Sequence, residues 1–272
     1  MPEDVDKGNE SVWRSMLLGT NSFIRYGHSA FSRLPRSPRC ELCAAPFKGP
    51  FTPLMHVLGR APFPKNPRYC SLCIGQLMHN KGGAEVELTA LFADVRGSTP
   101  LAEKLGATGV HEVMDRFYSD GVDALVRGGA IIERFMGDQI VGYFVPLYAG
   151  HEHAKRALET GLDVLRVTGN VGKTVPWLPV GVGVHTGVAF VGTVGRPGGL
   201  LELTAIGEDV NVAARLASEA AAGEMLCSEA TFHAAGLALA SESRVVTLKG
   251  VTEPVLVRVV RAKFRDQRSR LR

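Results

Sequence analysis

The sequence predicts an α+β protein with a ferredoxin-like βαββαβ core and a small metal-binding module in front of it. From residue 85 onward, apolar runs typical of strands alternate with longer amphipathic stretches in the order strand, helix, strand, strand, helix, strand. Before that point, two Cys-x-x-Cys pairs bracket a proline-rich segment with little helical pattern. The run Lys81-Gly82-Gly83-Ala84 marks the boundary between the two parts.

Composition indicates a globular protein with a full core. The chain has 272 residues, of which 45% are hydrophobic, and a net charge of +4. That charge suits an anionic substrate but does not demand nucleic acid, because it is spread along the chain apart from a C-terminal cluster. No apolar run approaches the roughly 18 residues of a membrane span. Met1-Pro2-Glu3-Asp4 is acidic where a secretion signal would be basic, so we expect a cytoplasmic protein.

Four segments are expected along the chain. Residues 1–39 form an N-terminal arm, partly helical, whose apolar side chains pack against a partner or the next module rather than a membrane. Residues 40–80 form the cysteine module, residues 85–262 the large α+β domain, and residues 263–272 a basic tail.

The cysteine pairs predict a structural zinc site. Two such pairs supply four thiolates at tetrahedral spacing, and the lack of a secretion signal disfavours two disulfides. His56 and His79 are substitute zinc ligands if one Cys does not bind. A redox or iron–sulfur role and unliganded thiols stay open as alternatives. The expected zinc ligands are Cys40, Cys43, Cys70 and Cys73. Cys227 stands in an apolar context and is expected to be a buried structural thiol.

Nucleic-acid binding by this module is not expected. Basic and aromatic residues interleave between the cysteine pairs, as at Lys48, Phe51, Arg68 and Tyr69, but no recognition helix is evident. A small metal-stapled module that braces the large domain, or passes a signal to it, fits the pattern better.

The elements of the large domain are expected in this order. A strand over 85–94 precedes a short helix 98–105 and a longer helix 108–127. Next come a hairpin of 130–136 with 139–145, a helix 149–169, and strands 178–185 and 188–194. A helix 208–221, a strand 224–227 and a hairpin of 243–248 with 255–260 complete the domain.

The stretch from Leu91 to Thr99 predicts a cation site beside an anion site. An apolar run ends at Asp94, which with the Val95 carbonyl offers hard oxygen ligands to Mg²⁺ or Mn²⁺. Gly97-Ser98-Thr99 then opens a helix whose first N–H groups suit a phosphate. A lone Asp after a strand is as often a turn or cap residue, so a cation site needs further ligands elsewhere in the chain.

Two later motifs supply candidates. Gly137-Asp138 places a second carboxylate at the tip of the predicted hairpin. The helix after Gly207 carries Asn211 and Arg215, which lie four residues apart and so share one face. A triphosphate with its metal ions would fit such a constellation.

These motifs resemble the catalytic domain of class III nucleotide cyclases in order, spacing and residue type, over about 180 residues from Glu85 to Arg261. The resemblance implies conversion of a nucleoside triphosphate to the 3′,5′-cyclic nucleotide and pyrophosphate. It also implies two Mg²⁺ or Mn²⁺ ions per site and a head-to-tail homodimer with composite sites. One subunit would supply the metal carboxylates, and the other the remaining groups.

The resemblance assigns a role to each matching residue. Asp94 and Asp138, with the Val95 carbonyl, would hold the two ions, and Gly97, Ser98 and Thr99 would face phosphate. Asn211 matches the asparagine that orients the ribose, Arg215 the transition-state arginine, and Lys249 the residue that holds the terminal phosphates.

Base recognition departs from the family pattern. Adenylate cyclases place Lys four residues before the second metal Asp, and guanylate cyclases place Glu there, but this chain has Arg134, paired with Thr204. Thr204 fits the bacterial adenylate type, so ATP is the expected substrate. Because Arg only donates, it can also meet guanine or pyrimidine acceptors, which leaves GTP, CTP and UTP as rivals. A regulatory pseudo-cyclase is the alternative outside enzymes.

Overall fold

The computed structural model describes residues 7–20, 30–31, 34, 38–40, 42–64, 66–79, 82–133, 137–172, 175–195, 201–250 and 254–263. It consists of two units. The smaller unit comprises residues 1–86 and 190–206, and the larger unit comprises residues 87–189 and 207–272.

A mixed sheet, whose strands belong mostly to the larger unit, confirms the predicted α+β class. Its strand order is β4-β5-β3-β6-β8-β10-β9, and β7 pairs with β6 off this path. β8 runs parallel to β6, whereas β5 is antiparallel to β3 and β10 is antiparallel to both β8 and β9. The strands are β3 (Gly83–Val95), β4 (Ile131–Ile132), β5 (Gln139–Phe144), β6 (Val180–Gly195), β7 (Leu201–Ile206), β8 (Glu224–Ser228), β9 (Ser241–Val246) and β10 (Val255–Arg261).

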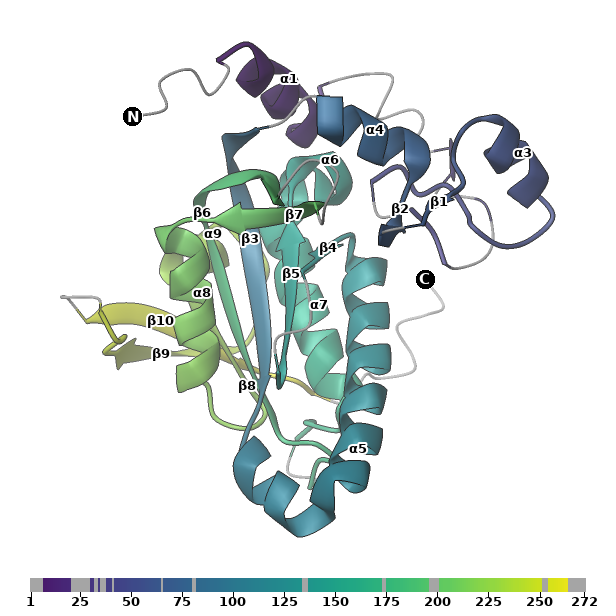
Figure 1. Ribbon diagram of the computed structural model, residues 1–272. Helices are drawn as coiled ribbons and strands as arrows, with labels where there is room; N and C mark the ends of the chain where they lie inside the picture. The colour runs from purple at the N-terminus through teal and green to yellow at the C-terminus, as the bar shows by residue number, and fades with distance from the viewer. Residues whose placement is uncertain are drawn as a thin grey trace, which may run out of the picture. The chain divides into compact units, whose positions relative to one another are not determined.

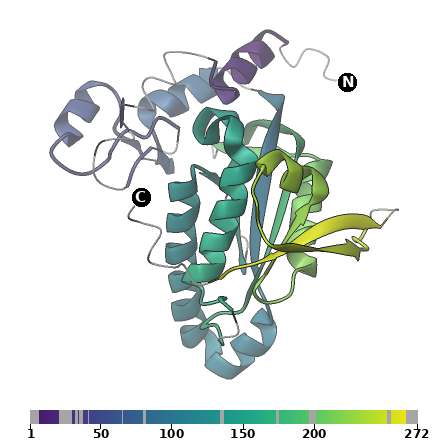
Figure 2. The ribbon, with the colours of Figure 1, turned by 180° about the vertical axis from the view of Figure 1, so that it is seen from behind.

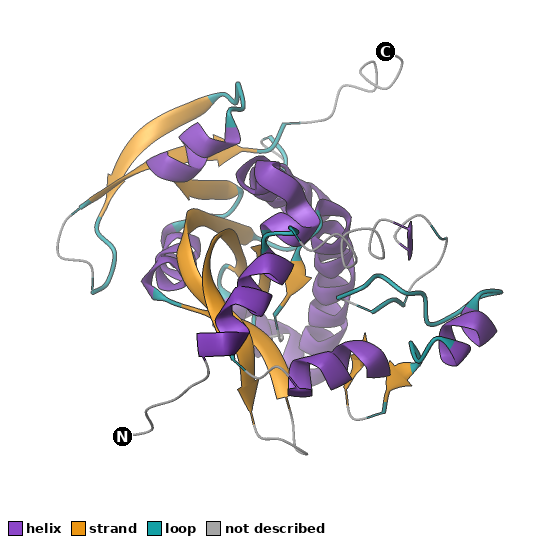
Figure 3. Ribbon diagram, turned by 90° about the horizontal axis from the view of Figure 1, so that it is seen from above, coloured by secondary structure: helices purple, strands orange, loops and turns teal. Residues whose placement is uncertain are grey.

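Helices cover both faces of this sheet (Figures 1 and 3). α5 (Ser98–Gly128), α7 (His153–Val167) and α9 (Glu229–Ala235) lie on the face seen in Figure 2, and α8 (Glu208–Glu219) lies on the other. Gly161 of α7 faces Val182 of β6, since a Cβ there would lie 3.3 Å from the Val182 side chain. The next strand residue, Gly183, faces α8, where a Cβ would lie 2.1 Å from the Ala217 nitrogen. This alternation along β6 lets the backbone of α8 approach the sheet closely.

Most predicted elements are found, with three corrections. The break between the two expected helices is present inside α5, at Gly106 with φ of 68°. The predicted helix 149–169 begins only at His153, because Gly150 at φ of 70° follows the short helix α6 (Pro146–Ala149) and a 3₁₀ turn, Gly150–Glu152, separates the two. The hairpin strand 130–136 has a two-residue strand, β4, in its described part, and residues 134–136 lie outside the description.

The two strands predicted at 178–185 and 188–194 are one continuous strand, β6. The Thr186-Gly187 pair does not turn because side chains from other elements bind the backbone on either side of it. Thr186 N–H donates to Thr231 Oγ1 at 2.7 Å, and Val188 N–H donates to Asp209 Oδ2 at 2.7 Å. These bonds satisfy amides where β6 has no strand partner from β8 or β7.

The smaller unit contains the predicted cysteine module. Its elements are α1 (Lys7–Leu17), α3 (Thr52–Val57), the antiparallel strands β1 (Pro62–Phe63) and β2 (Asn66–Cys70), and α4 (Ser71–His79). α1 buries Trp13 and Leu17. Among the described residues, no helix is both long and apolar enough to cross a membrane.

Candidate functional site

The ends of two neighbouring strands bring Asp94 and Asp138 together. β3 and β5 pair in antiparallel register up to Asp94 and Gln139, and Val95 N–H donates to the Asp138 carbonyl at 3.1 Å. The turn that carries Asp138 is held from α5 by Tyr118, whose hydroxyl donates to the Gly137 carbonyl. Two carboxylates far apart in the sequence therefore meet at one end of the sheet.

The surroundings of Asp94 favour a bound cation. Burial raises the pKa of Asp94, and the neighbouring charge of Asp138 raises it further, against the opposing effect of Arg96. The side chain of Asp94 is 13% exposed, and its Oδ2 accepts a hydrogen bond from Arg96 Nη2. Two adjacent carboxylates, with Arg96 paired to Asp94, leave excess negative charge, which hard divalent ions neutralise. The residues present thus fit Mg²⁺ or Mn²⁺.

The predicted anion site comes directly after β3. Gly97 adopts the left-handed conformation at φ of 69° and precedes the first turn of α5. Its side chain is a hydrogen atom, so no cap competes for the first N–H groups of the helix. Ser98 and Thr99 contribute such N–H groups, whereas Pro100 has none. The turn can thus present two amides to a phosphate.

Asn211 and Arg215 lie one turn apart on α8, as predicted. The start of this helix is fixed by Asp209, a residue that the sequence analysis did not single out. Asp209 Oδ1 accepts a hydrogen bond from His185 Nε2 at 3.0 Å, and Oδ2 binds the Val188 amide. His185 Nδ1 in turn lies 2.7 Å from Ser228 Oγ. This chain ties the first turn of α8 to β6 and β8.

Arg215 and the Lys249-Gly250 turn also lie together. A Cβ on Gly250 would be 3.4 Å from Arg215 Nη2, and Lys249 is exposed. The hairpin of β9 and β10 that leads to this turn is anchored at its other end by Glu224. Hydrogen bonds from Arg244 are the largest cause lowering the pKa of Glu224 to about 2, with Arg244 Nη1 at 2.8 Å from Oε2.

The described contacts thus form two groups. Asp94 and Asp138 make one, and Arg215 with Lys249 makes the other. Within the described ranges, no hydrogen bond or ion pair joins a carboxylate of the first group to Asn211, Arg215 or Lys249. Of the predicted base-reading pair, Thr204 lies on β7 opposite Gly192, and Arg134 lies outside the described residues.

The four cysteines of the module converge, as predicted. The sulfur atoms of Cys40, Cys43, Cys70 and Cys73 all lie within 4.8 Å of one another. Cys43 Sγ and Cys70 Sγ are 3.7 Å apart, too far for a disulfide and close to the ~3.8 Å edge of a tetrahedron of sulfurs around zinc. The cluster fits a zinc ion.

Backbone amides point at the same sulfurs. Cys70 N–H lies 3.2 Å from Cys40 Sγ, and Cys73 N–H lies 3.5 Å from Cys70 Sγ. Such donors stabilise thiolates. The substitute ligands His56 and His79 are exposed and stand outside the cluster. Cys227 is fully buried, as expected, and burial raises the pKa of its thiol to about 12.

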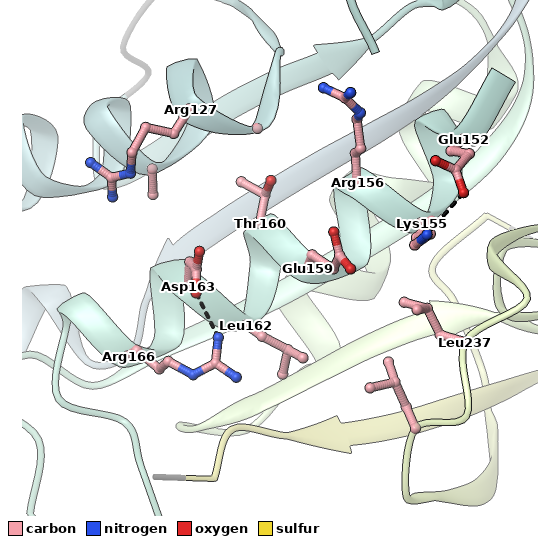
Figure 4. A pocket seen from close by; sticks show the side chains of 13 residues that line it. Arg127, Glu152, Lys155, Arg156, Glu159, Thr160, Leu162, Asp163, Arg166 and Leu237 are labelled. Atoms are coloured by element: carbon pink, nitrogen blue, oxygen red, sulfur yellow. Dashed lines mark hydrogen bonds and ion pairs between the residues drawn. The ribbon is translucent and has the colours of Figure 1, made fainter. Parts of the chain in front are cut away.

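A separate hollow of about 810 Å³ lies against α5 and α7 (Figure 4). Two ion pairs border it, Lys155 with Glu152 at 2.8 Å and Arg166 with Asp163 at 2.5 Å. Its lining contains none of the predicted site residues. The candidate site therefore rests on the strand ends and α8, not on this hollow.

The sequence analysis gave no role to three residues that shape the site: Arg96, His185 and Asp209. Arg96 lies two residues after Asp94 in the same motif. A positive charge so near a predicted metal ligand was the signal that could have identified it. His185 and Asp209 are 24 residues apart, and only the packing of α8 on β6 brings them together.

Comparisons with known proteins point to one family. Residues 83–253 match the family described as "Adenylate and Guanylate cyclase catalytic domain". An uncharacterized protein of Mycobacterium tuberculosis, Rv1319c, is 29% identical over 184 residues, which cover 65% of this chain and 34% of that protein. An adenylate cyclase of Anabaena cylindrica is 30% identical over 133 residues, 47% of this chain and 26% of that protein. The chain thus spans about a third of the length of the curated relatives it matches first.

Solved structures show the same likeness. The guanylyl cyclase Cya2 is 30% identical with a TM-score of 0.58, and the match covers 66% of this chain and 93% of that one. The adenylyl cyclase CyaB from P. aeruginosa is 28% identical with a TM-score of 0.59, covering 67% of this chain and 97% of that one. With the family match over more than half of its length, the chain belongs to the class III adenylate and guanylate cyclases.

Proposed function

We propose that the protein is an active class III cyclase that converts ATP to 3′,5′-cyclic AMP and pyrophosphate as a homodimer. The observation that supports this most is the meeting of Asp94 and Asp138 at adjoining strand ends, inside the range that matches the family. A pseudo-cyclase is disfavoured because the carboxylates, Asn211 and Arg215 are all retained.

The reaction makes few covalent demands on the protein. The ribose 3′-oxygen attacks the α-phosphorus, the bond to the bridging oxygen of the β-phosphate breaks, and the hydroxyl proton leaves to solvent. Divalent cations held by Asp94, Asp138 and the Val95 carbonyl would make the 3′-hydroxyl more acidic and offset charge on the phosphates. The two carboxylates therefore serve as ligands, and neither has to act as general base.

The remaining groups orient the nucleotide and compensate charge. The amides of Ser98 and Thr99 at the start of α5 suit a phosphate oxygen. Arg215 offers a planar fork for the α-phosphate oxygens as charge builds there, and Lys249, on the turn beside it, offers a point charge for the terminal phosphates. Asn211, one turn before Arg215, would bind the ribose.

We place these groups in two subunits. Asp94 and Asp138 of one protomer would face Asn211, Arg215 and Lys249 of the partner subunit, which gives two equivalent sites per dimer. Two observations are compatible with this division: Val95 beside Asp94 binds the Asp138 carbonyl, and Arg215 lies beside the turn that carries Lys249. A monomer would then be nearly inactive.

ATP is the proposed substrate, because Thr204 fits the bacterial adenylate type and because adenylate cyclases are among the similar proteins. The similarity to Cya2 favours GTP as the second candidate. Arg134 would then donate to guanine O6 and N7 instead of to adenine N1.

The purified full chain, loaded with Mn²⁺ and given ATP, GTP, CTP and UTP separately, tests this proposal. We expect cyclic AMP as the dominant product, and about a 1,000-fold loss of rate in Asp138→Asn, which removes a cation ligand. Cyclic CMP or UMP as the main product would overturn the ATP assignment alone. Bound nucleotide without any cyclic product would contradict the proposed enzymatic activity and favour a pseudo-cyclase.

A further inference from the structure

Arg96 links the carboxylate of Asp94 to the end of α8. Its Nη2 donates to Asp94 Oδ2, and its Nη1 donates to the Ser218 carbonyl at 2.7 Å. The backbone of Arg96 is fixed as well, because its N–H donates to the Pro179 carbonyl at 2.8 Å. The Arg96 side chain is only 23% exposed, so water screens this contact less than it screens a surface ion pair.

The Ser218 carbonyl belongs to the last turn of α8, where carbonyl groups lack partners within the helix. A guanidinium there both satisfies the carbonyl and lies at the negative end of the helix dipole. One planar side chain therefore binds two acceptors at once. A lysine, with a single ammonium group, is poorly suited to span them.

The contact between Arg96 and Asp94 competes with a cation. In the proposed function Asp94 is a cation ligand, and a divalent ion at that carboxylate repels the guanidinium beside it. The backbone of Asp138 is held separately, by the hydrogen bond that its carbonyl accepts from the Val95 amide. Arg96 must then weaken its bond to Asp94 when the ion binds, and its hold on Ser218 changes with it.

We propose that Arg96 is a positioning residue that couples cation occupancy at Asp94 to the C-terminal turn of α8. This inference rests on the proposed function. Because α8 carries Asn211 and Arg215, which serve the second site of the proposed dimer, filling one site alters the helix that completes the other. The two sites of the dimer are then coupled through Arg96.

Amide hydrogen exchange of residues 216–219 in the full chain, with and without Mn²⁺, tests the coupling. In the wild type we expect Mn²⁺ to speed exchange in this turn about fivefold, as the helix end loses its cap. In Arg96→Gln, exchange is already fast and does not respond to Mn²⁺. Calorimetry should show about tenfold tighter Mn²⁺ binding in this variant, because a competing charge is gone.

Two further variants keep the test decisive. Arg96→Lys retains the charge but not the fork, so we expect Mn²⁺ affinity near that of the wild type together with fast exchange at the end of α8. Arg14→Gln is the matched control, since Arg14 pairs with Glu10 at 2.8 Å on the exposed face of α1 and should change neither readout.

The outcomes separate this inference from the proposed function. Suppose that the wild type binds Mn²⁺, that Asp94→Asn does not bind it, and that amide exchange in α8 is the same with and without the ion. The coupling is then wrong and the cyclase proposal stands. Mn²⁺ binding that is the same in Asp94→Asn and the wild type would instead remove the cation site on which both depend.

Discussion

An equimolar mixture of the Asp94→Ala and Arg215→Ala variants is expected to recover about a quarter of wild-type cyclase activity, although each variant alone loses about 1,000-fold. Asp94 and Arg215 belong to different halves of the proposed composite site. Random pairing makes about half of the dimers mixed, and each mixed dimer keeps one intact site of two. The specific activity of the mixture, measured after subunit exchange, checks this expectation.

The chain offers a matched control for this experiment. A mixture of Asp94→Ala with Asp138→Ala should stay inactive, because both substitutions damage the same half of each site. Subunit exchange is verified by pulling down one differently tagged variant with the other. If the first mixture stays inactive although its subunits have exchanged, or if the second mixture regains cyclase activity, the shared-site arrangement is contradicted.

Removing zinc is expected to unfold the cysteine module while the large domain stays folded. The four thiols lie within 4.8 Å of one another, and the module offers only short elements around them, with β1 two residues long. Structural zinc contributes about 10–16 kcal/mol of apparent binding free energy in small domains, more than such a module can replace. Hydrogen exchange over residues 38–79, before and after a chelator, measures the effect.

The matched control for this prediction is Cys227→Ser. That thiol is fully buried in the larger unit and is not a member of the cluster, so its loss should leave metal content and module exchange unchanged. Cys70→Ser should lower bound zinc and raise exchange across the module. Equal protection of residues 38–79 with and without the chelator would contradict a structural metal.

Local signals in the sequence predicted those parts of the fold that depend on neighbours in the chain. Residue type alone predicted β3, whose apolar run ends at Asp94, and the break at Gly106 within α5. The same holds for the cysteine pairs, whose spacing anticipated the observed cluster. The resemblance to the cyclase family then placed the remaining candidate residues.

Distant contacts account for what the sequence did not reveal. Thr186 and Gly187 looked like a break between two strands, but the backbone there is bound by Thr231 and Asp209 from other elements, and β6 is continuous. β7 and α9 were missed: β7 is defined by its pairing with β6, and α9 is a single short helix capped by Ser228. Tertiary contacts overrode local pattern in β6 and β7.

The site shows the same division. Asp94, Asp138 and Arg215 sit in motifs with recognisable spacing, so the sequence and the family resemblance could name them as candidates, and the structure brings Asp94 and Asp138 to adjoining strand ends. The partners that orient them could not be named in this way. Arg96 reaches Ser218 across 122 residues, and His185 reaches Asp209 from another element. Such supporting contacts depend on packing and leave little trace in a single sequence.

Anomalous diffraction at the manganese edge, from crystals of the full chain grown with Mn²⁺ and a non-cyclisable ATP analogue, tests the central claim most directly. We predict two manganese peaks shared by the Asp94 and Asp138 carboxylates, facing Arg215 of the partner subunit across the nucleotide. Manganese bound away from both carboxylates, or a nucleotide held entirely within one protomer, would contradict it.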